Sequence, residues 1–202
     1  MMSTTDTFRL FVAVSIPQEV KARLAEVQSY LRQALPQAHI RWTQPELHLT
    51  LRFLGNVEAQ RLPQLAEAVI AACKGFAPLK LRAARLGCFP NTRRPRVIWV
   101  GNDDASAQLA ALQRAIQTAT QEFTTEEPEP NFSGHVTLGR IKEIQRQETD
   151  VLARAITNAA QKAWGEWTAD HVEIMRSELC NEGAKHVLAA SVNLGIACTD
   201  NQ

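Results

Sequence analysis

The pattern His-x-Thr-Leu occurs twice in this chain, as His48-Leu49-Thr50-Leu51 and as His135-Val136-Thr137-Leu138. Residues i and i+2 of a strand point to the same side, so each segment would present an imidazole and a hydroxyl together. Two imidazoles at one groove can donate and accept a proton near neutral pH. Two threonine hydroxyls can hydrogen-bond the oxygens of an anion held between them. This set of groups suits the cleavage of a phosphodiester and requires no metal.

An internal repeat argues that the two His-x-Thr-Leu segments are not a coincidence. A lone His-x-Thr arises often by chance, and two copies could still be sheet residues with satisfied rings. A shift of 87 residues, however, moves His48 onto His135 and also aligns Leu65 with Leu152 without a gap. The sequence therefore predicts two half-domains of related topology packed as one body, and their pseudo-twofold packing should bring the two polar faces together across a groove.

Hydrophobic periodicity predicts the elements that position these segments, in the order strand, helix, strands, helix, strands, followed by a similar series. Strands are predicted over 9–16, 40–42, 48–54, 79–88, 96–100, 135–141, 172–175 and 186–194. Helices are predicted around the apolar stripes Val20–Leu31, Leu62–Cys73, Leu109–Ile116 and Leu152–Ala163. The acidic, proline-containing stretch 126–130 is predicted to be a surface loop.

Composition restricts the functional classes. With 202 residues, 45% hydrophobic and 21% charged, the chain fits one folded domain or two small lobes. Its 22 Lys and Arg against 21 Asp and Glu leave a net charge of +1, so any contact with nucleic acid must come from a local patch. No apolar run approaches the roughly 20 residues of a membrane span.

The four cysteines, Cys73, Cys88, Cys180 and Cys198, form no C-x-x-C pair and no zinc-ribbon spacing. They fit reduced thiols in the cytoplasm, although two disulfides remain open.

The chain resembles the two-histidine (H-x-T-x) phosphoesterase superfamily, and within it the RNA 2′,3′-cyclic phosphodiesterases, also called 2′-5′ RNA ligases. The resemblance covers nearly the whole chain and is carried by residues 9–14, 42–46, 48–55, 95–101 and 135–140. One departure is Ser133-Gly134 before the second motif, where Pro-His is commoner, and we expect it to alter only loop stiffness. The resemblance implies an α+β fold in which residues 1–202 form a single bilobal domain with a pseudo-twofold duplication. Two antiparallel sheets would face a central cleft, with helices packed on the outside.

The resemblance also implies a mechanism. His48 would be the proton donor to the departing 3′ oxygen of a terminal 2′,3′-cyclic phosphate, and His135 the proton acceptor that activates water. Thr50 and Thr137 would bind the non-bridging oxygens, and the product would be an RNA 2′-phosphomonoester. With a 5′-hydroxyl in place of water, the same geometry would give ATP-independent 2′-5′ ligation. No cofactor is implied, and we expect a monomer because the duplication already supplies a pseudo-dimer.

Two arginines are candidate phosphate ligands. Arg52 shares strand parity with His48 and would reach the groove or its rim, although a solvated edge position is equally compatible; Leu49, Leu51 and Phe53 should take the opposite, core-facing side. Arg140 has the wrong parity to lie beside His135, yet the family associates this arginine with the phosphate site. A bulge at Gly139 would turn it inward.

The remaining candidates carry weaker signals. Arg93, Arg94 and Arg96 form the densest basic cluster and could hold RNA phosphates, but a solvated loop is the simpler interpretation. Trp42 and Phe132 each precede a motif and could stack a base, although core packing is favoured for either taken alone. His39, His171 and His186 lack a partner motif and are interpreted as structural or surface residues.

Three other functions share some of these features. A phosphodiesterase acting on a small nucleotide-derived cyclic phosphate or on an oligoadenylate would keep both motifs and differ in groove size. An RNA-end binding module would not need both histidines. A metal enzyme would need ligand spacings that this chain lacks, and its activity would be lost in a chelator.

Overall fold

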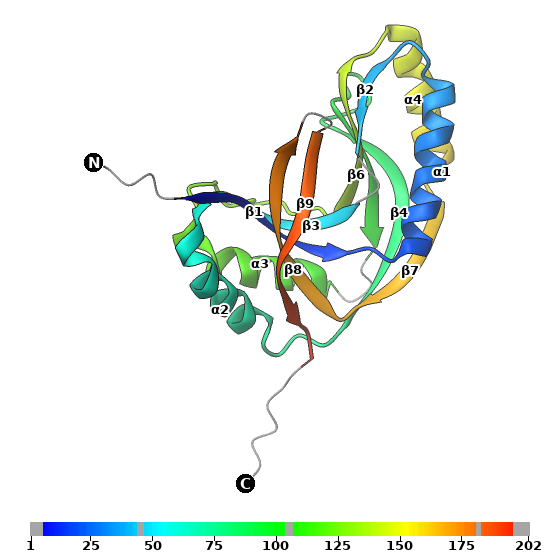
Figure 1. Cartoon of the computed structure of the whole chain (residues 1–202). Coiled ribbons are helices and arrows are strands. Elements are labelled where there is room, and N and C mark those ends of the chain that lie inside the picture. The colour runs from blue at the N-terminus through cyan, green and yellow to red at the C-terminus, as the bar shows by residue number, and fades with distance from the viewer. Residues whose placement is uncertain (1–5, 44–46, 104–106, 181–182, 196–202) are drawn as a thin grey trace, which may run out of the picture.

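The computed structural model describes residues 6–43, 47–103, 107–180 and 183–195, with the backbone alone at 179–180 and 183–184 (Figure 1). The strands are β1 (Thr7–Ser15), β2 (His39–Trp42), β3 (His48–Glu58), β4 (Leu79–Phe89), β5 (Val97–Asp103), β6 (His135–Glu143), β7 (Ala163–Ala169), β8 (His171–Cys180) and β9 (Gly183–Asn193). The α-helices are α1 (Gln18–Ala34), α2 (Leu62–Cys73), α3 (Gln108–Ala119) and α4 (Arg146–Asn158), and two 3-10 turns cover Ala59–Arg61 and Gln121–Phe123.

The described strands form one curled antiparallel sheet in the order β7-β4-β5-β6-β3-β1-β8-β9, with β2 also pairing with β6. The sheet divides naturally at β6 and β3, which are joined by the single residue pair Val136 and Leu49. Along this path four strands lie on each side of the junction, and β2 is a fifth strand on the β6 side. The α+β class and the duplicated, two-lobed form are therefore confirmed. The two sheets expected to face each other are instead continuous through this short pairing.

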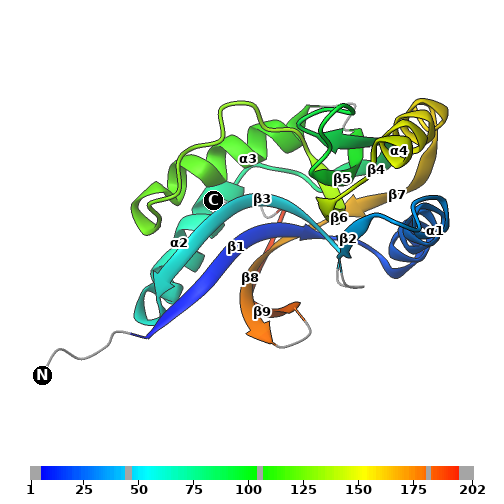
Figure 2. The same cartoon turned by 90° about the horizontal axis from the view of Figure 1, so that it is seen from above.

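The helices cover the outer side of each lobe, as Figure 2 shows from above. Helices α1 and α4 pack on the lobe of β4 and β7, and α2 and α3 pack on the lobe of β3 and β9. Each helix turns one apolar stripe inward, because its large apolar residues recur every three to four positions. The stripes meet in one buried cluster to which every helix contributes, through Leu24, Leu65, Leu112 and Leu152 among others, each at most 1% exposed.

The region after α4 differs from the prediction. The helix ends at Asn158, and Ala163, predicted on its apolar stripe, begins strand β7. Alanine is the strongest helix former, so the alanines at 159 and 160 led the predicted helical period too far. Pairing with β4 decides the outcome, because it sets Trp167 opposite Leu81 and buries both side chains.

Candidate active site

The two His-x-Thr segments lie side by side at the junction of the lobes. Leu49 pairs with Val136 in antiparallel register, and both side chains are buried. Their neighbours therefore point to the opposite face, and continuing the register sets His48 beside Thr137 and Thr50 beside His135. The two histidines are thus diagonal neighbours, about 7–8 Å apart at the backbone. They share one sheet face, where the sequence predicted two faces meeting across a groove.

The His48 imidazole lies among aromatic rings. Its ring centroid is 6.0 Å from that of Phe11 and 5.6 Å from that of His186, both in edge-to-face geometry. His186 comes from β9 and also contacts Phe11, at 4.9 Å. The sequence interpretation of His186 as a structural or surface residue did not indicate this contact, which arises because the pairing of β9 with β8 and of β8 with β1 brings this histidine beside His48.

The His135 imidazole is oriented by a backbone hydrogen bond. Its Nδ1 lies 2.7 Å from the carbonyl oxygen of Ser133, and because a carbonyl can only accept, Nδ1 carries the proton. In the neutral ring this leaves Nε2 as a proton acceptor. Phe89 packs edge-to-face against the ring with centroids 5.1 Å apart, and Trp99 lies at 6.3 Å. The second histidine therefore has a defined tautomer and two aromatic supports.

Both histidines and both threonines line one cleft of about 880 Å³. The aromatic side chains on its wall are Phe11, Trp42, Phe53, Phe89 and Phe132. Its charged lining residues are Arg9, Arg41, Arg52, Arg140, Glu126, Glu127 and Glu129. The cleft thus combines two imidazoles, stacking surfaces and both signs of charge, a composition that can hold a nucleotide-sized anion.

Matching bulges follow the two motifs. In β3 the residue Leu51 is skipped in the pairing with β1, and in β6 the equivalent Leu138 is skipped in the pairing with β5. Each extra residue resets the alternation of side chains. Arg140 therefore lines the cleft, as a bulge near Gly139 would require. Phe53 also faces the cleft and is 56% exposed, so its predicted core-facing position was wrong.

Arg52 is neither a solvated edge residue nor a cation open to a ligand. It is 4% exposed, and its guanidinium donates hydrogen bonds to the carbonyl oxygens of Glu126 at 2.7 Å and Glu127 at 2.8 Å. A longer bond reaches Oε1 of Gln121 at 3.3 Å. Burial lowers the pKa of this guanidinium, and the nearby Glu126 carboxylate opposes that effect. We interpret Arg52 as the anchor of the acidic segment 126–129, in place of the predicted phosphate contact.

The other singled-out residues divide between the cleft and the outer surface. Trp42 lines the cleft while also packing against the core, and the Arg32 guanidinium lies 5.2 Å from its ring centre. Phe132 lines the cleft as well. His39 and the arginine cluster 93–96 are exposed. The acidic stretch expected as a surface loop contributes three glutamates to the cleft wall, which the sequence did not indicate.

His171 has the structural role predicted for it. Its Nε2 lies 3.2 Å from Oγ of Ser15 at the end of β1, and its Nδ1 donates to the Asp170 carboxylate at 2.6 Å. This hydrogen bond lowers the pKa of Asp170. The cluster therefore ties the start of β8 to the end of β1.

Two cysteines, Cys73 and Cys88, are free and buried, and burial raises the pKa of Cys73 to about 11. The side chains of Cys180 and Cys198 lie outside the described residues. Within the described ranges, no three His, Cys, Asp or Glu side chains gather as a metal site. None of the helices there is long and apolar enough to span a membrane.

The chain is similar in sequence to a known family and to proteins of known name. The sequence model of the family described as LigT like phosphoesterase matches residues 14–99 and again residues 100–186. The RNA 2′,3′-cyclic phosphodiesterase of Methanothermobacter thermautotrophicus is 30% identical over 178 residues, covering 87% of this chain and 92% of that protein. The Thermus thermophilus protein of the same name is 30% identical over 193 residues, covering 92% of this chain and 90% of its own.

Solved structures show the same fold. TT0787 of Thermus thermophilus superposes with a TM-score of 0.74 at 28% identity, covering 92% of this chain and 97% of its own. LigT of Escherichia coli complexed with 3′-AMP also gives a TM-score of 0.74, at 19% identity, covering 94% of this chain and 99% of its own. The second likeness is one of fold alone. The chain belongs to the LigT-like phosphoesterase family.

Proposed function

We propose that this protein hydrolyses RNA 2′,3′-cyclic phosphate ends to 2′-phosphomonoesters. The observation that carries the proposal is the diagonal arrangement of His48 and His135 at the Leu49–Val136 junction, inside one cleft. A phosphate between the two imidazoles would have one ring near the attacking oxygen and the other near the leaving oxygen, because these two oxygens lie on opposite sides of the phosphorus. The names of the family relatives support this substrate.

We assign the role of proton acceptor to His135, and its hydrogen bond to the Ser133 carbonyl supports this assignment. With Nδ1–H held by the Ser133 carbonyl, Nε2 takes a proton from water as the water oxygen bonds to phosphorus. The bond from phosphorus to the 3′ oxygen breaks, and protonated His48 gives that oxygen its proton. The cycle leaves His135 protonated and His48 neutral, and exchange with solvent restores both. In this proposal His48 is the proton donor, the complement of this base and the role that the family resemblance implies.

Thr50, Thr137 and Arg140 complete the phosphate site in this proposal. The threonine hydroxyls lie on the histidine face and would donate to the non-bridging oxygens. Arg140 lines the same cleft and would compensate the charge that these oxygens carry in the transition state. A 5′-hydroxyl entering in place of water would give 2′-5′ ligation through the same groups, because the bond broken is the same.

The test is a short RNA ending in a 2′,3′-cyclic phosphate, incubated with the wild type, His48→Ala and His135→Ala in EDTA. A 2′-phosphate product is expected from the wild type. Each variant should lose about 10²–10⁴-fold in rate, the usual contribution of a general acid or base. Circular dichroism would show that the variants are folded.

Either of two results would overturn the proposal. A 3′-phosphate product would mean that the other ester bond is broken. Full activity in either histidine variant would remove that imidazole from the reaction. Turnover of mononucleoside cyclic phosphates without turnover of RNA ends would favour the small-substrate alternative.

A further inference from the structure

Two arginines face the cleft from directly opposite positions on neighbouring strands. Arg41 of β2 pairs with Arg140 of β6, and both side chains are exposed and line the cleft. Opposite residues of an antiparallel pair place their Cβ atoms about 4.5–5.5 Å apart on one face, and like charges there destabilise the sheet. Among the described residues neither guanidinium forms an ion pair. Such a pair is expected where a ligand with more than one anionic group places one group near each guanidinium.

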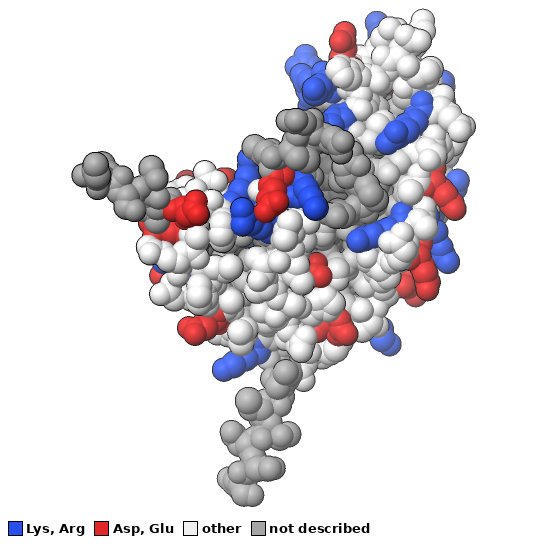
Figure 3. All heavy atoms as spheres, viewed as in Figure 1, with Lys and Arg blue, Asp and Glu red and all other residues white. Residues whose placement is uncertain are grey.

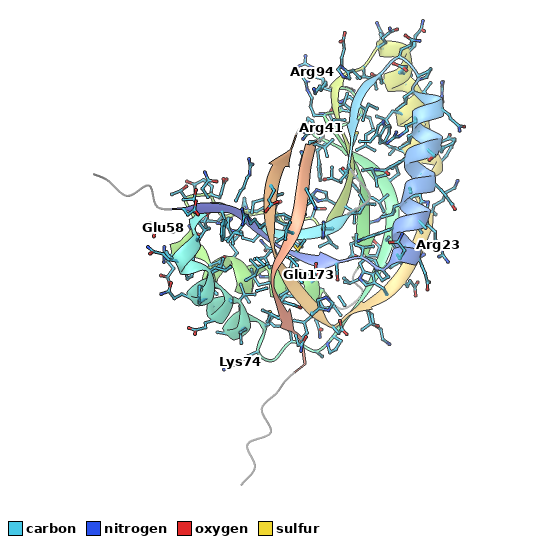
Figure 4. All side chains as sticks on the ribbon, viewed as in Figure 1. Arg23, Arg41, Glu58, Lys74, Arg94 and Glu173 are labelled. Carbon is cyan, nitrogen blue, oxygen red and sulfur yellow. The ribbon has the colours of Figure 1, made fainter. Side chains whose placement is uncertain are left out.

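Further cations continue outward from this pair. Lys142 lies two residues after Arg140 in β6, at an irregularity in the pairing with β2, and is exposed. Arg96 lies across the sheet, and its carbonyl accepts a hydrogen bond from the amide of Ile141 at 2.8 Å. Beyond it the loop bearing Arg93 and Arg94 is shaped by Asn91, whose Oδ1 accepts both of their amide protons. Figure 4 shows Arg41 and Arg94 at the same end of the molecule, where Lys and Arg side chains gather in Figure 3.

The opposite end of the cleft is acidic. Because β3 and β6 are antiparallel, they leave the Leu49–Val136 junction in opposite directions, β6 toward Lys142 and β3 toward Gly55. The segment 126–129 lies at the β3 end, where Thr124 Oγ1 donates to the Leu54 carbonyl at 2.7 Å. It brings three glutamates to the cleft. Among the described cleft-lining residues, Arg9 is an exposed cation at that end, while the charge of Arg52 is directed to backbone carbonyls. Of the two ends of the cleft lining, the end with Arg41 and Arg140 is therefore the more favourable exit for a polyanion.

We propose that single-stranded RNA leaves the cleft along β2, β6 and β5, with Arg41 binding the first backbone phosphate before the terminal cyclic phosphate. Lys142, Arg96 and the loop of Arg93 and Arg94 form the rest of the track. This inference rests on the proposed function for the identity of the terminal group. If Arg41 binds this phosphate, RNA with more than one phosphate should bind more tightly than a mononucleotide. Arg41 lies on β2, which carries neither catalytic histidine.

The experiment measures binding apart from catalysis. A fluorescent single-stranded RNA of about eight nucleotides, ending in a 2′-phosphate, is titrated with the wild type, Arg41→Gln and Arg23→Gln at several salt concentrations. Arg23 is exposed on α1, far from Arg41 (Figure 4), so its variant makes the same charge change away from the track. Arg41→Gln should weaken binding about tenfold, as expected for a charge-assisted contact. Its salt slope should become shallower by about 0.7, the value for one phosphate of a single strand.

A second measurement separates the two proposals. Hydrolysis of a mononucleoside 2′,3′-cyclic phosphate should differ less than about twofold between the wild type and Arg41→Gln, because this substrate has no second phosphate. RNA binding that is equal in Arg41→Gln and Arg23→Gln, or no RNA binding by the wild type, overturns the track. An equal fold-loss in RNA binding and in hydrolysis of the mononucleoside cyclic phosphate overturns it as well, since Arg41 would then act at the terminal phosphate. RNA binding that depends on Arg41, with no hydrolysis of the mononucleoside cyclic phosphate or of an RNA 2′,3′-cyclic phosphate end, leaves the track in place and refutes the proposed function.

Discussion

Replacing Arg52 by methionine would test the interpretation that this arginine holds the acidic cleft wall. The guanidinium is buried, and it bonds two successive carbonyls, at 2.7 and 2.8 Å, and one side-chain oxygen at 3.3 Å. Methionine keeps most of the apolar stem and removes every donor. The segment 126–129 would then lose its hydrogen bonds to the Arg52 side chain, while the catalytic strands keep their own pairing.

The size of the effect follows from these contacts. Hydrogen bonds to a charged group contribute about 1.5–3 kcal/mol each, so the two short bonds represent about 3–6 kcal/mol. Methionine avoids the cost of burying a cation, which offsets part of this loss. We expect a net decrease of about 3 kcal/mol in the free energy of unfolding. In a domain of this size that corresponds to a Tm lower by about 6–12 °C.

The assay is thermal unfolding followed by circular dichroism, together with limited proteolysis of the segment 121–129. Arg61→Met is the matched control, because Arg61 also bonds this segment, at the carbonyl and carboxylate of Glu122, but with a side chain that is 35% exposed. An exposed pair contributes about 0–1 kcal/mol, so its Tm should fall by only a few degrees. Equal Tm values for the two variants would refute the anchoring role. A stable Arg52→Met protein with slow turnover would restore the phosphate role.

Two further substitutions probe the packing of the strands. Gly139→Ala places a methyl 2.9 Å from Cγ2 of Ile40 and 3.1 Å from the Trp42 ring, so β2 should move away from β6 at a cost of about 1–3 kcal/mol; an unchanged urea midpoint would contradict this close approach. Asp170→Asn removes a carboxylate whose folded-state pKa is lowered by its hydrogen bond to His171. A lowered carboxyl pKa stabilises the fold above the unfolded value of about 3.9 and is lost as the pH falls through the folded value. The wild type should therefore be more stable than the variant at pH 7, and the gap should close below about pH 4; a gap independent of pH would show that the charge of Asp170 is irrelevant.

The sequence predicts which side chains share a strand face where the strand is regular, and it does not predict where a bulge changes the pairing register. The period of two places His48 with Thr50 and His135 with Thr137 whatever the rest of the fold does. The same period predicted the wrong side for Phe53, because a bulge at Leu51 shifts the residues that follow it, up to a second irregularity at Leu54. Bulges depend on how the partner strand fits, and no single-strand pattern reports that fit.

The position of the acidic segment 126–129 could not be predicted from the sequence either. Its glutamates and prolines predict a loop, and the chain does lack a regular element there. Its position is set by Arg52, some 70 residues earlier, through bonds to the backbone carbonyls of Glu126 and Glu127. Because any residue supplies a carbonyl, no side-chain pattern in the loop could reveal that contact.

The sequence alone determined the two motifs, their strand faces, the apolar stripes of the helices and the relatedness of the halves, since each is written in residues close together along the chain. The tertiary structure decided which distant strands meet. Pairing of β6 with β3 makes the two histidines diagonal neighbours, pairing of β8 with β9 adds His186, and pairing of β2 with β6 sets Arg41 against Arg140. These neighbours are separated by up to 138 positions, as between His48 and His186, and are brought together by backbone hydrogen bonds and core packing. Backbone hydrogen bonds between strands and core packing depend on the whole chain, so the local spacing of residues does not predict these contacts.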